Sequence, residues 1–390
     1  MQKKILRLIY LVIVTALIFT GCNPMKKEDT TVDTWEETLT EWKSVSPQEI
    51  DEHIDVTVSD SYCIDADIMV SESLESYEIQ NVYLTRHILD DVGTVLESWL
   101  AYCGIAEYSE IKHAECGKLL EEGKEMYMAD AGFGEDNLSW AQVRSTYALM
   151  VTEFTENYGK WNLHSMFSRQ NDGWMNLNKT KILENNEIIP QEKVLEIQEN
   201  IASIFGVEFM DEYILYTYNL EQLKEIVDFT YKYEKDMGFI TQKWDVTDAD
   251  EGAVIVFQQG YQGIPFTFLQ PSKNVTGATW SVDNYCLVTV SKDEIKGLEI
   301  MNLYNIEEEA ESVKILSFGE FVEKHVQMRE GVDTKVVNIG LYYLPIYTEE
   351  AFRFVTKPVW CVQTEKMKES GYTIREWDIY DAVTGEEMAW

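Results

Sequence analysis

Residues 317–331 read SFGEFVEKHVQMREG and residues 335–343 read KVVNIGLYY, and this stretch decides the predicted fold class. Ser317 and Glu320 have the spacing of a capping box, in which each side chain hydrogen-bonds to the backbone of the other residue. Apolar residues then recur at helical spacing until Gly331, a residue type that commonly ends helices. The expected buried face of this helix comprises Phe318, Phe321, Val322 and Val326. The stretch therefore predicts a helix that leads directly into a strand.

Consecutive strands are predicted on both sides of this helix in the sequence. They cover residues 253–257, 264–269, 285–290, 298–304, 335–343, 352–364 and 372–381. Lys296 and Gly297 are predicted to form a hairpin turn just before residues 298–304. Because strands and helices do not alternate in regular β-α-β order, the pattern indicates an α+β fold with antiparallel sheets.

The first half of the chain is predicted to combine strands with helices. In residues 63–70 apolar side chains alternate with Asp65 and Asp67, which is typical of a half-buried strand. Further elements are expected at residues 77–84 as a strand and at residues 88–100 and 140–158 as helices. These elements predict a mixed strand and helix domain.

The predicted organisation has four parts. An irregular polar stretch at residues 161–182 separates the two halves, and Pro190 opens a new helix. The parts are a signal peptide at residues 1–21, a tether at 22–33, an N-terminal α+β domain at 34–185 and a C-terminal α+β region at 186–390. We expect the C-terminal region to fold alone, because the apolar faces of its helices and strands can bury one another.

The N-terminus has the features of an export signal. Three basic residues within residues 1–7 precede an apolar run at residues 8–19. A helix of that length covers roughly 18 Å at ~1.5 Å per residue, which is short for a hydrocarbon core of roughly 30 Å. The run ends in FTGC at residues 19–22, which resembles the lipobox of bacterial lipoproteins. The resemblance implies cleavage before Cys22, lipid attachment to that cysteine and a location on the outer face of a membrane.

The composition indicates a folded and strongly acidic protein. The chain holds 32 basic and 69 acidic side chains, which gives a formal net charge of -37. Such a field repels phosphate backbones, so no nucleic-acid partner is expected. A hydrophobic content of 45% is ample for packed cores.

Short motifs in both halves resemble known families. A helix, a strand, a strand containing KPVW at residues 357–360 and a last strand closing in DAVTGE at 381–386 resemble a PepSY-type unit. YQGIPF at residues 261–266 is similar to a strand entry of the extracellular YycH and YycI regulators of cell-wall histidine kinases. IDADIMV at residues 64–70 resembles the start of an uncharacterised lipoprotein family of clostridia-like bacteria. The resemblances imply PepSY-like units of a helix plus an antiparallel sheet, and a role in binding, inhibition or regulation without catalytic residues.

The sequence contains no motif of a known metal or cofactor site. Cys103, His113 and Cys116 lack a fourth ligand and a zinc-finger spacing. The acidic loop at residues 245–252 lacks the EF-hand spacing, so a solvated loop is favoured over a calcium site. No cofactor, no metal and no enzymatic activity are therefore predicted.

Three tryptophans and two aspartates are the remaining candidate functional residues. Asp65 and Asp67 lie roughly 7 Å apart on one strand face, a separation that glycosidases also use, but the solvent face of a strand is the favoured interpretation. Trp161, Trp174 and Trp280 stand in polar surroundings, where an exposed ring stacks on a sugar or a peptide. These three are the candidate ligand contacts.

The predicted function is that of a lipid-anchored extracytoplasmic binding or regulatory module. Its expected partners are the membrane, through the lipid on Cys22, and a membrane or envelope protein. The alternative is a glycan- or solute-binding lipoprotein associated with a transporter. A deep aromatic cleft would favour ligand binding, whereas a shallow surface with an exposed sheet edge would favour a protein partner.

Overall fold

The computed structural model of the chain describes most residues between Trp35 and Met388. The described ranges are 35–71, 73–119, 124–133, 139–151, 188–236, 243, 245–269, 276, 283–292, 294–348, 353–367 and 373–388. Contacts divide the chain into residues 1–38 and residues 39–390. In the first part only residues 35–38 are described, and they begin helix α2 (Trp35–Trp42). Two large sheets dominate the second part.

The first of these sheets, called sheet A, is mixed and takes strands from both ends of the chain. Its order is β1 (His53–Ser59), β2 (Tyr62–Met69), β15 (Thr334–Tyr347), β16 (Arg353–Met367), β17 (Thr373–Asp381) and β18 (Glu387–Met388). Strand β3 (Glu78–Arg86) pairs with β16 and with β14 (Tyr304–Lys314). Strands β2 and β15 run parallel, and the other pairs run antiparallel. Helix α8 (Phe318–Met328) packs on one face through Phe321, whose ring stacks on Trp360 with centroids 5.2 Å apart.

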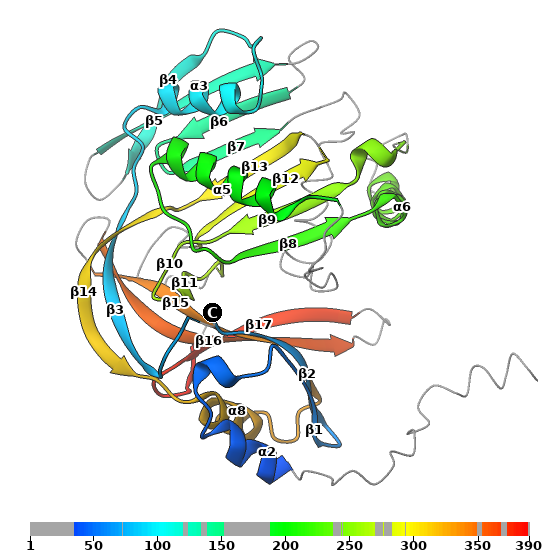
Figure 1. Ribbon diagram of the computed structural model, residues 1–390, viewed down its shortest axis with the longest axis vertical. Coiled ribbons are helices and arrows are strands. Elements are labelled where there is room, and N and C mark those ends of the chain that lie inside the picture. The colour runs from blue at the N-terminus through cyan, green and yellow to red at the C-terminus, as the bar shows by residue number, and fades with distance from the viewer. Residues whose placement is uncertain are drawn as a thin grey trace, which may run out of the picture. The chain divides into compact units, whose positions relative to one another are not determined.

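The second sheet, called sheet B, is antiparallel throughout its described strands. Its order is β4 (Lys112–Leu119), β5 (Lys124–Phe133), β6 (Ser139–Arg144), β7 (Tyr147–Val151), β13 (Ile295–Met301), β12 (Tyr285–Ser291), β9 (Gly252–Phe257) and β8 (Tyr213–Tyr218). Helices α3 (Val92–Tyr102) and α5 (Gln191–Phe205) lie over one face, as Figure 1 shows. Helix α6 (Leu220–Asp236) packs on the opposite face through Leu223.

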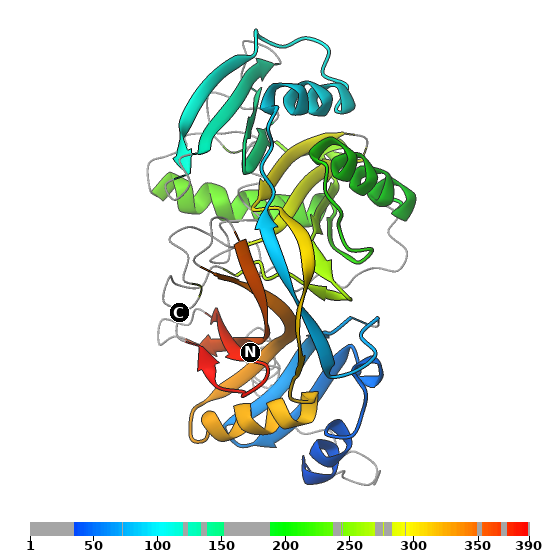
Figure 2. The same cartoon turned by 90° about the vertical axis from the view of Figure 1, so that its left-hand side faces the viewer.

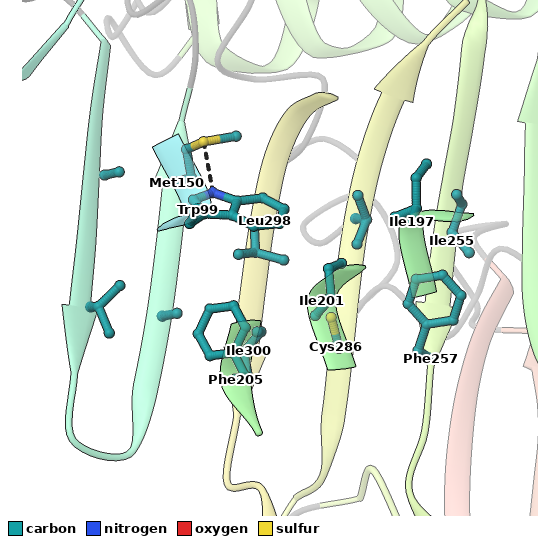
Figure 3. Packing of buried hydrophobic residues seen from close by; sticks show 14 of the residues in the cluster. Trp99, Met150, Ile197, Ile201, Phe205, Ile255, Phe257, Cys286, Leu298 and Ile300 are labelled. Atoms are coloured by element: carbon teal, nitrogen blue, oxygen red, sulfur yellow. Dashed lines mark hydrogen bonds between the residues drawn. The ribbon is translucent and has the colours of Figure 1, made fainter. Parts of the chain in front are cut away.

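The main core lies between sheet B and the helix pair α3 and α5. Trp99 is 1% exposed, and its indole Nε1 donates a hydrogen bond to Met150 Sδ at 2.9 Å. Figure 3 shows these two side chains beside the apolar residues of β9, β12 and β13. Four buried alanines of β5, β6 and β7 join the same cluster, namely Ala129, Ala131, Ala141 and Ala148. Their short side chains let α3 approach the sheet closely.

Two segments join the sheets. Strand β14 follows β13 of sheet B after two residues and then runs along β3 in a long antiparallel ribbon, which is seen in Figure 2. A short hairpin of β10 (Gly260–Tyr261) and β11 (Ile264–Pro265) comes after β9 of sheet B. Directly after it, the Thr267 backbone N–H donates a hydrogen bond to the carbonyl oxygen of Tyr343 in sheet A, at 2.8 Å.

The predicted fold class, an N-terminal mixed domain followed by PepSY-like units of a helix plus an antiparallel sheet, is wrong. Strands dominate the described residues, and the two large sheets make the fold closer to all-β. The order of α8, β15, β16 and β17 agrees with the predicted elements. In space, however, β15 pairs with β2 and β16 pairs with β3, so this helix and its strands do not form a separate unit.

The predicted helix at residues 140–158 accounts for much of this error. Residues 139–151 form β6 and β7, which are joined by a two-residue turn at Ser145 and Thr146. Trp140, Val143 and Met150 recur at helical spacing, but residue 140 is only partly buried. The inward-facing positions alternate as Ser139, Ala141 and Val143, and small side chains at two of them conceal the strand pattern.

The turn predicted at Lys296 and Gly297 is also misplaced. Both residues lie inside β13, and β12 and β13 are joined instead where the backbones of Ser291 and Glu294 hydrogen-bond to each other. The predicted capping box of α8 is confirmed. Helix α6 is capped by Asn219 and Gln222, each of whose side chains accepts a hydrogen bond from the backbone N–H of the other. Within the described residues, no helix has the length and apolar character needed to cross a membrane.

The predicted domain boundary between residues 185 and 186 divides the strands of each sheet between the two predicted halves. In sheet A it separates β2 and β3 from their partners β15 and β16. In sheet B it separates β7 from β13. Both sheets therefore depend on pairing between the two predicted halves.

Candidate functional site

A pocket of about 130 Å³ opens where α3, α5 and the turn between β12 and β13 meet. Its lining residues are Tyr102, Cys103, Ile189, Lys193, Glu196, Ile197, Val290, Ser291, Lys292, Glu294 and Ile295. We call this the α3–α5 pocket. It combines almost fully buried aliphatic residues with charged residues from two different elements.

Local sequence features bring the three walls together. Helix α3 ends at Tyr102, and its C-cap residue Cys103 is followed by Gly104, whose φ of 73° lies in the left-handed region that glycine adopts most easily. Pro190 directly precedes α5, where its missing N–H breaks no helical hydrogen bond. The third wall follows a β-bulge between Thr289 and Val290, and such bulges redirect the side chains that follow them.

The interior of the pocket is made by buried aliphatic side chains. Ile189, Ile197 and Val290 are at most 3% exposed, and they belong to the main core. Burial of these side chains is expected to keep the walls in place, because each also packs on sheet B. The α3–α5 pocket therefore has walls that are held by the packing of the main core.

Ion pairs surround the mouth of the pocket. Lys193 Nζ lies 3.3 Å from Glu196 Oε1 on α5, and both side chains are about half exposed, at 40% and 53%. On the opposite wall, Lys292 Nζ lies 2.8 Å from Glu251 Oε2, and Lys296 pairs with Glu294. Both signs of charge are thus available within one rim.

Two further groups of α3 reach the pocket. The Tyr102 hydroxyl oxygen is closed off from solvent and makes no hydrogen bond of good geometry within the described residues. Burial, reinforced by the negative charge of Glu196, raises the pKa of Tyr102 to about 12. Burial also raises the pKa of the Cys103 thiol to about 12, so this cysteine is neutral at pH 7 and a poor nucleophile.

A second, smaller cavity lies beside His87. It measures about 10 Å³, which corresponds to the space of roughly one water molecule. The His87 imidazole is already engaged there, through Nδ1 with Asn305 Oδ1 and through Nε2 with the Phe205 carbonyl oxygen. This cavity is too small for an organic ligand.

A buried polar network joins β3 to the segments that flank β12 and β13. The Arg86 guanidinium donates to Asn302 Oδ1, and the Asn302 amide donates to Asp283 Oδ1 at 3.1 Å. Gln259 and Asn284 extend it, with Asn284 Nδ2 donating to Gln259 Oε1 at 2.9 Å. Because these side chains satisfy one another, the network positions the connection between the sheets.

The two aspartates predicted on a solvent face do lie on one. Asp65 and Asp67 are exposed on β2, while the residues between and beside them are buried. His53 lies between them, with Nδ1 2.8 Å from Asp67 Oδ1, and Lys335 Nζ lies 3.0 Å from Asp65 Oδ2. Asp67 is thus hydrogen-bonded to His53, and Asp65 forms a surface ion pair with Lys335, which is worth about 0–1 kcal/mol.

Side chains of the acidic loop at residues 245–252 make hydrogen bonds and an ion pair within the fold, and His113 packs against α3. Asp250 accepts hydrogen bonds from the backbone and hydroxyl of Thr247, and Glu251 pairs with Lys292. The His113 ring packs directly against Gly93 of α3. A larger residue at position 93 would place its Cβ atom where this ring lies. Among the residues whose placement is described, no group of acidic, histidine or cysteine side chains is arranged to hold a metal.

The other predicted site residues lie outside the described part of the chain. These are the lipidation residue Cys22 and the tryptophans Trp161, Trp174 and Trp280. The α3–α5 pocket was not anticipated from the sequence. Its charged residues come from segments about one hundred residues apart, and no local motif links Lys193 to Lys292.

Comparison with known proteins gives similarity of fold alone. No family model matches the chain, and no curated protein matches it. The chain is similar to the crystal structure of an uncharacterized protein from Eubacterium rectale, with 18% sequence identity and a TM-score of 0.65. The similarity covers 91% of this chain and 99% of the other. The fold described above is therefore shared with a solved structure.

Proposed function

We propose that the chain is a lipid-anchored extracytoplasmic protein that binds a small solute without transforming it. The observation that carries the binding role is the α3–α5 pocket, a concavity of about 130 Å³ with a charged rim over buried aliphatic side chains of the main core. Small-molecule sites are typically concave and hold a few placed polar groups. Anchoring rests on the export signal and on Cys22 in the lipobox-like FTGC sequence.

The small size of the pocket favours a solute over a glycan chain. An engineered cavity of roughly 150 Å³ holds one benzene molecule, so about 130 Å³ suits a group of similar size. A glycan chain would need an extended surface. We therefore propose that the protein binds a small solute. With the solute bound, it would act on a transporter or on a regulatory partner.

Binding is tested by screening a metabolite library against the purified full-length lipoprotein in detergent. A true ligand raises the unfolding temperature with increasing concentration, because it binds the folded state alone. Glu196→Gln should weaken the shift, and Glu199→Gln on the exposed side of the same helix should leave it unchanged. If no compound shifts the transition, or if both variants respond equally, the pocket is not a binding site.

Anchoring is tested separately by Cys22→Ser. We expect this variant to lose incorporation of labelled palmitate and to leave the membrane fraction, since each buried methylene of an acyl chain contributes ~0.8 kcal/mol to attachment. Cys63→Ser, which alters a partly buried thiol of β2, is the matched control and should remain labelled. Unchanged labelling of the Cys22→Ser protein would refute lipidation at this residue.

A further inference from the structure

We infer that the open edge of sheet A at β1 binds an extended, basic segment of a protein partner, which pairs with β1 as an added antiparallel strand. In this segment, lysine or arginine alternates with apolar residues. The inference goes beyond the proposed solute binding and does not depend on the α3–α5 pocket. It rests on the backbone of β1, on the regular alternation of its side chains and on its unbalanced negative charge.

The backbone of β1 has hydrogen-bonding groups directed away from the sheet. Strand β1 stands at the end of the strand order of sheet A, as Figure 1 shows, and pairs with β2 on its inner side. On that side the Ile68 N–H donates to the Glu52 carbonyl oxygen at 2.8 Å. In an antiparallel ladder, alternate residues bond to the partner strand and the residues between them point away. The N–H and C=O groups of His53, Asp55 and Thr57 are therefore directed to the open edge.

This edge lacks the features that usually prevent strand addition. Residues 53–57 pair with residues 63–67 in regular register, and the first irregularity comes between Thr57 and Ser59. Edge strands are commonly protected by proline, lysine or bulges, and residues 53–57 have none of these. The edge strand β14 is different, because two register shifts interrupt its pairing with β3 and its residues 307–309 are exposed glutamates. Of these two edges, β1 is the one suited to receive a strand.

The side chains of β1 define the alternation expected in the partner. His53, Asp55 and Thr57 are exposed on one face of the strand, whereas Val56 and Val58 are half-buried on the other. Residues directly opposite each other in paired strands share a face. An added strand would therefore place polar side chains beside Asp55 and apolar side chains beside the two valines, with a period of two residues.

The charge of the edge selects a basic partner. Asp55 lies opposite Asp65 of β2, and Lys335 Nζ is 3.0 Å from Asp65 Oδ2. Asp55 itself has no ion-pair partner among the residues that the structure describes. A lysine or arginine opposite Asp55 would form a favourable cross-strand pair with it. Residues 51–60 contain no lysine or arginine and four acidic residues, namely Asp51, Glu52, Asp55 and Asp60.

The same charge disfavours a second copy of this chain as the added strand. Antiparallel pairing of two β1 strands about Asp55 would place the two copies of this aspartate directly opposite each other, and like charges in that position are destabilising. Asp55 therefore acts against self-association and in favour of a basic segment, which is a way of achieving specificity through repulsion as well as attraction.

The test uses a labelled synthetic peptide in which lysine and valine alternate, with lysine at both ends and the seven-residue length of β1. Its affinity for the full-length lipoprotein in detergent is measured by fluorescence anisotropy. In the proposed pairing each lysine lies on the Asp55 face, and its N–H is directed to β1. Methylating the lysine amides should therefore weaken binding at least about tenfold, because the hydrogen bonds to the edge are lost. Methylating the valine amides, which point away from β1, should leave the affinity unchanged.

A charge exchange assigns the interaction to Asp55. The Asp55→Lys variant should lose affinity for the lysine peptide and should bind a peptide with glutamate in place of lysine more tightly than the parent protein does. Glu199→Lys, on the exposed side of α5, changes the net charge by the same amount and should leave both affinities unchanged. Thermal unfolding of both variants shows whether they are folded, and the methylated peptides test the pairing on the unaltered protein.

Non-specific attraction of cations to this acidic chain is excluded by a further peptide of the same composition, with its lysines gathered in one block. We expect it to bind at least about tenfold more weakly than the alternating peptide, because it cannot place lysine and valine on separate faces. If the block peptide or the peptide with methylated lysine amides binds as tightly as the alternating one, the inference is wrong. It is equally overturned if the alternating peptide does not bind, or if a folded Asp55→Lys variant keeps the preference of the parent.

Discussion

At the scale of single residues, two buried titratable groups make opposite contributions to acid stability. His325 of α8 is 1% exposed and packs against Tyr380, and its Nδ1 is hydrogen-bonded to the Tyr62 hydroxyl. Burial, followed by the positive charge of Arg329, lowers the pKa of His325 to about 3. The imidazole is therefore neutral in the folded protein at every pH above that value.

His325 is expected to make the fold sensitive to acid. Its pKa is 6.5 when exposed, so below pH 6.5 the unfolded chain binds a proton that the folded chain does not. The free energy of unfolding should fall as the pH falls from about 6.5 towards 3. His325→Phe should flatten this dependence in urea unfolding measured at pH 7, 5.5 and 4.5. An unchanged slope in the variant would show that another group is responsible.

Asp283 should act in the other direction. Burial raises its pKa to about 6, against a usual value of 3.8, although Asn302 and Arg86 partly oppose the shift. Between those two values the folded state binds the additional proton, so stability from this group is lost as the pH rises towards and beyond 6. Asp283→Asn should gain stability relative to the parent between pH 4 and pH 7.5. The measurement is the difference in unfolding free energy at the two pH values, and a constant difference would contradict it.

At the scale of elements, α8 is held on sheet A by aromatic packing. The Phe321 ring lies nearly parallel to that of Trp360, at an angle of 11°, and also contacts Tyr380 edge-on. Its side chain is fully buried. The helix is therefore fixed through one central side chain and its neighbours.

Truncating that side chain should be costly. Phe321→Ala is expected to lower the unfolding free energy by about 3–5 kcal/mol, because a buried ring is lost and a cavity remains. Gln327→Ala, on the exposed face of the same helix, should change stability by less than about 0.5 kcal/mol. Denaturant unfolding followed by circular dichroism measures both. Equal stabilities for the two variants would mean that α8 does not pack as described.

At the scale of the whole molecule, each sheet is completed by strands from distant parts of the chain. Strands β15 and β16 form the centre of sheet A, but their outer partners β2 and β3 come from the first ninety residues. Sheet B likewise joins β7 to β13. Such long-range pairing makes folding depend on the intact chain.

A fragment comprising residues 186–390 should therefore fail to fold alone. It lacks β2, β3 and β7, which would expose the edges of β15 and β13 and part of the α3 side of the main core. Exposed apolar edges of this kind favour aggregation over cooperative folding. Thermal and urea unfolding of the fragment should show no cooperative transition, whereas the full-length chain should show one. A cooperative transition in the fragment would support the autonomous C-terminal region expected from the sequence.

The sequence by itself determined the local features of this protein. Capping residues fixed the start of α8, glycines of positive φ followed the ends of α3 and α5, and the alternation around Asp65 and Asp67 defined β2. These features depend on hydrogen bonds and steric limits within a few residues, so they can be predicted from the sequence without knowledge of the fold. The export signal stays a prediction of the same kind, because it depends on a short linear pattern.

Only the tertiary structure decided the pairing of strands and the position of the pocket. The small residues of β6 are strand residues because α3 packs closely over them, which no local pattern reveals. The parallel pair of β2 and β15 joins segments more than 250 residues apart, and Lys193 meets Lys292 at the pocket only after sheet B has formed. Both outcomes depend on burying apolar faces against distant partners, a free energy that belongs to the assembled fold and to no single segment.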